Sequence, residues 1–205
     1  ILRGACGWSL LRARGPPPPA VQRRERRPKT GLPSRSTRGR RAGTDACVWA
    51  LDPIDGTVSF TRGIPCYGVL IGLRETATDR GLVGVIHLPA LGETYSAARG
   101  AGAFCGEERL TLSAGVPEGR PGPILSAGDP NQFTDGGVPD DYARLTSFSR
   151  YFRGYADCFG HALALRGAVD AHVDPGLSAW DLGPTDVLFD EAGGGGEAAS
   201  SVGGV

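Results

Sequence analysis

The part of this 205-residue sequence with the clearest chemical content is a pair of aspartates, Asp52 and Asp55, which follows the apolar run of residues 47–51. Two carboxylates in a turn beyond a strand end can share one hard cation such as Mg²⁺, which prefers oxygen ligands. Gly56 and Thr57 come next. If they open a helix, their free backbone N–H groups favour a phosphate. Carboxylates beside such amides indicate a metal-assisted phosphoryl-transfer site.

A plain solvated turn is the alternative, because Asp-Pro and Asp-Gly are common turn dipeptides. A second acidic segment, residues 179–194, favours the chemical interpretation. Its Asp181 falls at a predicted helix start after Trp180, and the pair Gly193-Gly194 is a typical helix end.

Together the two segments resemble the paired signatures of the inositol monophosphatase superfamily, in their order and approximate separation. The stretch from Asp157 to His161, with the sequence Asp-Cys-Phe-Gly-His, is similar to a segment of the histidinol-phosphatase branch. The resemblance covers about residues 46–194. It implies an α/β fold of stacked α/β/α/β/α layers, of the inositol monophosphatase/fructose-bisphosphatase type, which is N-terminally incomplete here.

The resemblance also implies roles for single residues. Asp52, Asp55, Asp181 and the backbone carbonyl of Ile54 would be magnesium ligands, with Asp52 shared between two ions. Gly56 and Thr57 would bind the phosphate, and the Thr57 hydroxyl would orient the attacking water.

Two further acids bear on the substrate. Asp157 and Asp174 match positions that face the substrate in the family, although the first can also be a helix N-cap and the second a turn acid. Two carboxylates near the leaving alcohol suit a cationic substrate. The implied reaction is magnesium-dependent hydrolysis of L-histidinol phosphate to L-histidinol; the alternatives are an inositol-1-monophosphatase and a catalytically impaired fragment or binding remnant.

One departure from the family supports the remnant. The family carries a further metal-binding glutamate, in a Gly-Glu-Glu segment some twenty residues before the first aspartate. The corresponding residues 29–41 are basic and contain no acid. The first metal site is therefore expected to be incomplete.

Charge divides the chain unevenly. Lysine and arginine together equal aspartate and glutamate at 22 each. Residues 1–45, however, contain only Glu25 and Asp45 as acids, so the remainder is net acidic, which suits a cation-binding pocket. We expect a Pro/Arg-rich leader at 1–45, a partial phosphatase domain at 46–194 and a Gly-rich tail at 195–205.

The leader has three interpretations: a broken or mistranslated upstream sequence, a transit peptide, or a nucleic-acid-binding arm. The last is disfavoured because no aromatic residue lies among its arginine clusters. The start at Ile1 and the lack of methionine favour a fragment. Five cysteines without a CxxC pair argue for a reducing compartment, either cytoplasm or plastid. No apolar run is long enough to span a membrane. The expected partner is a small phosphorylated metabolite, and the resemblance adds a possible homodimer.

The elements that must position these residues follow from hydrophobic patterning. Residues 47–51 are expected to form a buried strand that Pro53 terminates. Further strands are predicted at 67–73, 82–88, 93–97, 124–127 and 169–173, helices at 140–147 and 157–167, and turns at 100–104 and 174–176. His87, His161 and His172 are interpreted as packing or surface residues.

Overall fold

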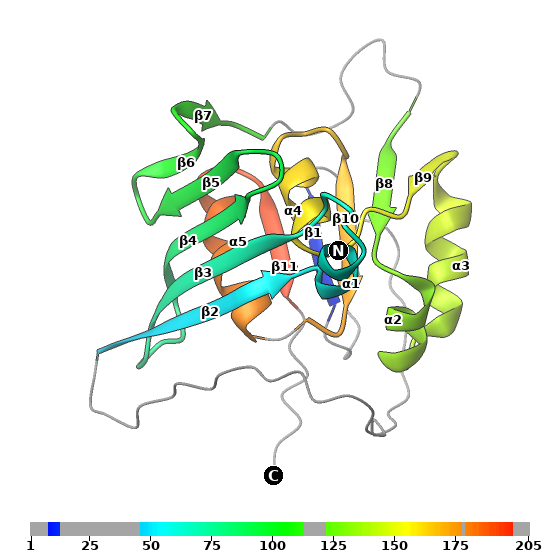
Figure 1. Cartoon of the computed structure of the whole chain (residues 1–205), viewed down its shortest axis with the longest axis horizontal. Helices are drawn as coiled ribbons and strands as arrows, with labels where there is room; N and C mark the ends of the chain where they lie inside the picture. The colour runs from blue at the N-terminus through cyan, green and yellow to red at the C-terminus, as the bar shows by residue number, and fades with distance from the viewer. Residues whose placement is uncertain (1–7, 13–45, 113–121, 178, 199–205) are drawn as a thin grey trace.

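A computed structural model describes residues 8–12, 46–112, 122–177 and 179–198, which form two β-sheets and several helices (Figure 1). The six-stranded sheet runs in chain order and is antiparallel throughout. Its strands are β2 (Cys47–Asp55), β3 (Gly68–Glu75), β4 (Gly81–Leu88), β5 (Glu93–Ala98), β6 (Gly102–Cys105) and β7 (Glu108–Leu110). The predicted antiparallel strands are confirmed, and residues 99–101 form a turn between β5 and β6.

The five-stranded sheet has the order β11-β1-β10-β8-β9. β8 (Ile124–Ala127) is parallel to both β9 (Tyr151–Arg153) and β10 (Ala171–Pro175), whereas β1 (Trp8–Arg12) runs antiparallel to both β10 and β11 (Gly195–Ala198). β1 and β11 lie in the stretches that we predicted to be leader and tail. The three-part division of the chain itself stays a prediction.

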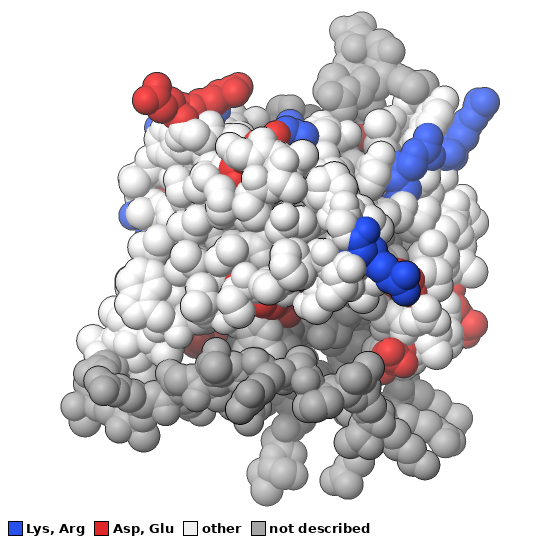
Figure 2. Space-filling model, in the orientation of Figure 1, with Lys and Arg blue, Asp and Glu red and all other residues white. Residues whose placement is uncertain are grey.

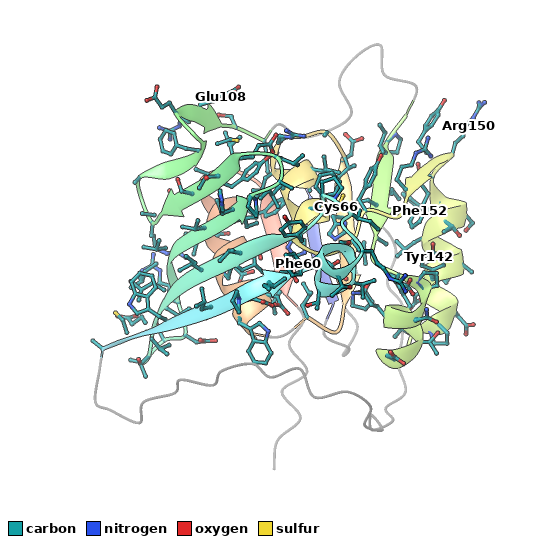
Figure 3. The ribbon with its side chains drawn as sticks, viewed as in Figure 1. Phe60, Cys66, Glu108, Tyr142, Arg150 and Phe152 are labelled. Carbon is teal, nitrogen blue, oxygen red and sulfur yellow. The ribbon has the colours of Figure 1, made fainter. Side chains whose placement is uncertain are left out.

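Helices separate and cover the sheets, which gives a layered α/β fold as predicted. α4 (Asp157–Leu165) and α5 (Ala179–Glu191) lie between the two sheets: α5 packs on β2 to β5, and α4 contacts both β3 and β10. α2 (Pro130–Asp135) and α3 (Pro139–Phe148) lie beside the five-stranded sheet (Figure 1). There, Tyr142 of α3 and Phe152 of β9 point toward each other, with ring centroids 5.5 Å apart (Figure 3).

The contact between α5 and the six-stranded sheet depends on two paired glycines, Gly72 of β3 and Gly84 of β4. A Cβ atom on Gly84 would lie 2.1 Å from the carbonyl oxygen of Pro184, and one on Gly72 would lie 3.0 Å from its nitrogen. The missing side chains therefore let the helix backbone rest directly on the sheet. Leu70 and Ile86 on the same face and Val187 and Phe189 on the helix are fully buried, and they belong to the larger hydrophobic core.

The opposite face of this sheet differs from the sequence prediction. β2 was expected to be a buried strand, but Trp49 is 63% exposed and Leu51 57% exposed. Figure 2 shows that most of the side chains on this side of the molecule are uncharged. The prediction was wrong because an unbroken apolar run says how hydrophobic a strand is, and not whether another layer covers it.

Two element boundaries also differ. β2 continues through Pro53 to Asp55, with an irregular register between Asp52 and Asp55. β2 lies at the edge of its sheet, where the donor that proline lacks is not needed on the open side. Asp174, predicted in a turn, lies in β10 because pairing with β1 extends that strand to Pro175. No described helix is long and apolar enough to cross a membrane.

Candidate active site

Three carboxylates from distant parts of the chain meet at one place. Asp52 and Asp55 stand at the end of β2, and Asp181 lies in the first turn of α5. One oxygen from each lies within 4.8 Å of the others. The structure thus brings together the three aspartates that the sequence predicted as metal ligands.

The irregular end of β2 gives these acids their positions. The backbone N–H of Ile54 donates to Oδ1 of Asp52 at 3.0 Å, which closes a tight turn between the two aspartates. Because the register shifts here, Asp52 and Asp55 are not forced to alternate strictly between the two faces of the sheet.

The N-terminal end of α4 supports Asp55 from the opposite side. The backbone N–H of Cys158 donates to Oδ2 of Asp55 at 2.6 Å. Asp157, the preceding residue, has a positive φ of 58°, which is unusual for a residue other than glycine. This backbone conformation occurs where α4 meets Asp55, so local strain and the functional candidates coincide.

Two features of the structure favour glycine at position 56. Its φ of 75° lies in the left-handed region, and a Cβ atom would lie 2.8 Å from the carbonyl oxygen of Cys66 and 3.4 Å from Oδ2 of Asp157. Figure 3 labels Phe60 and Cys66 on the segment that returns from this turn to β3. A side chain at Gly56 would therefore disturb both the backbone and its neighbours.

Thr57 begins the short helix α1 (Thr57–Thr61), as the sequence indicated. Its hydroxyl donates to the carbonyl oxygen of Ile54 at 3.0 Å, and the N–H of Phe60 donates to the carbonyl of Gly56. Thr57 Oγ1 and the Ile54 carbonyl, two predicted functional groups, are thus directly bonded to each other.

The acids of this site repel one another. Burial, followed by smaller contributions from Asp52 and Asp174, raises the pKa of Asp55. Burial and then the charge of Asp55 raise the pKa of Asp157 to about 7. Such a concentration of carboxylates favours a bound cation. The all-oxygen donor set of Asp52, Asp55 and Asp181 fits a hard ion such as Mg²⁺.

Asp174 has a different environment from the one expected of a residue that touches substrate. It is 0% exposed in β10, and its Oδ2 lies 3.7 Å from Nε2 of His172 and 3.8 Å from Nε2 of His161. Sequence reasoning missed this cluster and interpreted each histidine separately. The only available signal was the spacing of His172 and Asp174, which places both side chains on one face of a strand.

The upstream region in which the family carries its additional glutamate, residues 29–41, lies outside the described residues.

Comparison with known proteins identifies the family. Residues 23–200 match the inositol monophosphatase family. The chain is 36% identical over 146 residues to a histidinol-phosphatase of Chlorobaculum parvum, covering 71% of this chain and 55% of that protein. It is 37% identical over 151 residues to a histidinol-phosphatase of Mycobacterium tuberculosis, covering 71% and 56%.

A solved inositol monophosphatase structure from Zymomonas mobilis superposes with a TM-score of 0.63 at 27% identity, covering 74% of this chain and 58% of that one. The chain therefore spans a little over half the length of the relatives that it matches. The matched residues include every acid of the carboxylate cluster. With its layered fold, this chain belongs to the inositol monophosphatase family, a family of phosphatases.

Proposed function

We propose that this chain carries the metal- and phosphate-binding centre of a magnesium-dependent phosphomonoesterase that hydrolyses L-histidinol phosphate to L-histidinol. The observation that carries the proposal is the convergence of Asp52, Asp55 and Asp181 from two different layers of the fold. The histidinol-phosphatase relatives support the choice of substrate.

In this proposal Asp52, Asp55, Asp181 and the carbonyl oxygen of Ile54 hold Mg²⁺. When bound, Mg²⁺ offsets the negative charge of the phosphate and makes water a better nucleophile. The hydrogen bond from Cys158 holds the Asp55 carboxylate in place. This support limits the rearrangement that binding requires.

The residues that follow would bind phosphate and position water. Gly56 and Thr57 offer backbone N–H groups to the phosphate. The Thr57 hydroxyl already donates a hydrogen bond to the carbonyl oxygen of Ile54. Its remaining lone pairs are therefore directed to accept a hydrogen bond from the attacking water, which orients that water.

We assign recognition of the substrate amine to Asp157. Its side chain lies near Gly56 and is strongly influenced by Asp55, so it stands beside the phosphate position. A carboxylate there complements an ammonium group and gives nothing comparable to an uncharged polyol. Asp174 was predicted for the same role, but it is completely buried. For that residue a different function is argued below.

Two other functions have specific support. Likeness to the solved inositol monophosphatase supports an inositol-1-phosphatase. The acid-free residues 29–41, where the family has a metal-binding glutamate, support a catalytically impaired remnant. A homodimer and a reducing compartment, cytoplasm or plastid, remain predictions from the sequence.

Phosphate release from L-histidinol phosphate and from inositol-1-phosphate, with Mg²⁺ and then with EDTA, tests the proposal. We expect magnesium-dependent release that is faster from histidinol phosphate. Equal or faster release from inositol-1-phosphate would favour the inositol-phosphatase. Release from neither substrate by a folded chain would overturn the assignment of activity and favour the remnant.

A further inference from the structure

A second group of metal-ligating side chains lies outside the carboxylate cluster. His161 of α4 and His172 and Asp174 of β10 each place one ring nitrogen or carboxylate oxygen within 4.8 Å of the others. All three residues are buried, with exposed fractions of 1%, 0% and 0%. This group joins the helix layer to the five-stranded sheet.

The polar atoms of this group are unsatisfied. Among the described residues, both ring nitrogens of His161, Nε2 of His172 and both carboxylate oxygens of Asp174 have no hydrogen-bond partner. The shortest separations between them, 3.7 and 3.8 Å, are too long for hydrogen bonds. Five unpartnered buried atoms carry a large desolvation penalty, and three of them, the two Nε2 atoms and Oδ2 of Asp174, lie close enough together to share one ion.

Protonation of a histidine does not readily remove this penalty. Burial, followed by the neighbouring ring of His172, lowers the pKa of His161 to about 3. Burial therefore disfavours a charged imidazole at His161. A neutral imidazole keeps the lone pair that a metal ion needs.

A neighbouring hydroxyl holds one ligand in position. Oγ of Ser126 lies 2.7 Å from Nδ1 of His172. When that Nδ1–H donates to the serine oxygen, Nε2 is the unprotonated nitrogen and presents its lone pair toward Asp174. Hydrogen bonds of this kind commonly orient metal-bound histidines.

We propose that His161, His172 and Asp174 form a metal site separate from the carboxylate cluster, for a transition-metal ion such as Zn²⁺. Two imidazoles and one carboxylate match the ligand preferences of Zn²⁺, whereas Mg²⁺ prefers oxygen ligands and retains its waters. Tetrahedral Zn²⁺ with metal–ligand distances of about 2.0–2.1 Å places its ligands roughly 3.4 Å apart. The two separations from Oδ2 of Asp174 to the histidine nitrogens would need to contract by only a few tenths of an ångström, and all three ligand atoms lie within 4.8 Å of one another.

Cobalt binding by the full chain tests the site, because Co²⁺ substitutes for Zn²⁺ and absorbs visible light. The chain is cleared of metal by a chelator under unfolding conditions and refolded with one equivalent of Co²⁺ in a large excess of Mg²⁺. We expect retained Co²⁺ with intense visible bands and no near-ultraviolet thiolate-to-cobalt band. Added Zn²⁺ should displace it.

Matched variants locate the ion. His161→Phe and His172→Phe should abolish the visible bands, and His87→Phe, at the remaining histidine of the chain, should not. Asp181→Asn should also retain them, so loss of phosphatase activity and loss of this site are separable. Ser126→Ala leaves all three ligands in place, and it should weaken Co²⁺ binding by about 10- to 100-fold.

Three results would overturn the proposal: Co²⁺ displaced by the excess of Mg²⁺, a thiolate band, or unchanged visible bands in His161→Phe and His172→Phe. If a phenylalanine variant does not fold, the Co²⁺ affinity of Ser126→Ala tests the site in its place. Co²⁺ affinity equal to that of the unsubstituted chain would then refute the site.

Discussion

At the scale of the residue, the candidate site depends on a few side chains with distinct neighbours. Asp55 is held by the N–H of Cys158, Thr57 is bonded to the Ile54 carbonyl, and Asp157 lies beside both segments. These contacts separate the acid that we assign to the substrate from those that we assign to the metal. Substitutions can therefore test the two roles one at a time.

Asp157→Ala tests substrate recognition. Loss of the carboxylate should lower kcat/KM for histidinol phosphate at least about tenfold more than for inositol-1-phosphate, which corresponds to ~1.4 kcal/mol. Steady-state kinetics on both substrates measure the difference. An equal loss on the two would exclude recognition of the amine by this residue.

Asp186 on α5 should make the stability of the fold depend on pH, and Asp186 is not one of the predicted metal ligands. Burial raises its pKa to about 6, although the Arg74 guanidinium 3.5 Å away opposes the shift. The native state thus holds this proton more tightly than the unfolded chain, so ionisation of Asp186 destabilises the fold above pH 6. Falling pH removes that penalty between about 6 and about 4, the ordinary aspartate range.

Asp186→Asn should therefore be more stable than the unsubstituted chain at pH 8, by on the order of 1 kcal/mol. The advantage should shrink below pH 6 and vanish near pH 4. Urea unfolding across this pH range, with EDTA present, measures it. Asp190→Asn is the control, because Asp190 lies four residues along the same helix with its side chain 48% exposed. A pH-independent difference would contradict the prediction.

At the scale of the element, α5 both packs the core and carries Asp181. Its close approach to β3 and β4 requires Gly72 and Gly84, and its far end is fixed because Glu191 accepts from the N–H groups of Gly100 and Gly102 at 2.8 and 2.9 Å. Packing of this helix therefore sets the position of one predicted metal ligand.

Gly84→Ala should displace α5, because the new Cβ atom would meet the Pro184 carbonyl oxygen at 2.1 Å. Overpacking of this kind costs about 1–3 kcal/mol in the free energy of unfolding. Thermal unfolding measures the loss, and Mg²⁺ titration should show weaker binding. Gly154→Ala, where a Cβ atom meets nothing within 4 Å, is the control. Equal stability of the two variants would refute the close packing.

The two faces of the six-stranded sheet should respond differently to the same substitution. Leu70→Ala removes a fully buried side chain and should cost about 2–5 kcal/mol. Leu51→Ala removes one that is 57% exposed and should change stability by no more than about 0.5 kcal/mol. Denaturant unfolding compares them. A large loss from Leu51→Ala would mean that another layer covers this face in solution.

At the scale of the whole molecule, the carboxylate cluster joins two layers, because Asp52 and Asp55 come from a sheet and Asp181 from a helix behind it. A cation bound there stabilises only the assembled fold. Mg²⁺ at ~100 times its dissociation constant should add about 2.7 kcal/mol to the free energy of unfolding. Thermal unfolding with Mg²⁺ and with EDTA measures the shift. Asp181→Asn should reduce it strongly, and an unchanged shift in that variant would place the ion elsewhere.

The sequence by itself determined the local elements and singled out the candidate residues of the main site. Apolar runs rich in β-forming residues and separated by turns predicted β3, β4 and β5, glycine predicted the end of α4, and two acidic motifs pointed to the family. These features can be predicted because hydrophobic patterning, turn residues and motif spacing depend only on residues that are close together in the sequence.

Only the tertiary structure decided which surfaces are covered and which distant side chains meet. The start of β2 is as apolar as a buried strand, yet Trp49 and Leu51 lie on the face of the sheet away from α5 and are exposed. The grouping of His161, His172 and Asp174 arises because α4 packs against β10. Burial and long-range proximity depend on the packing of layers, and no single segment of the sequence encodes them.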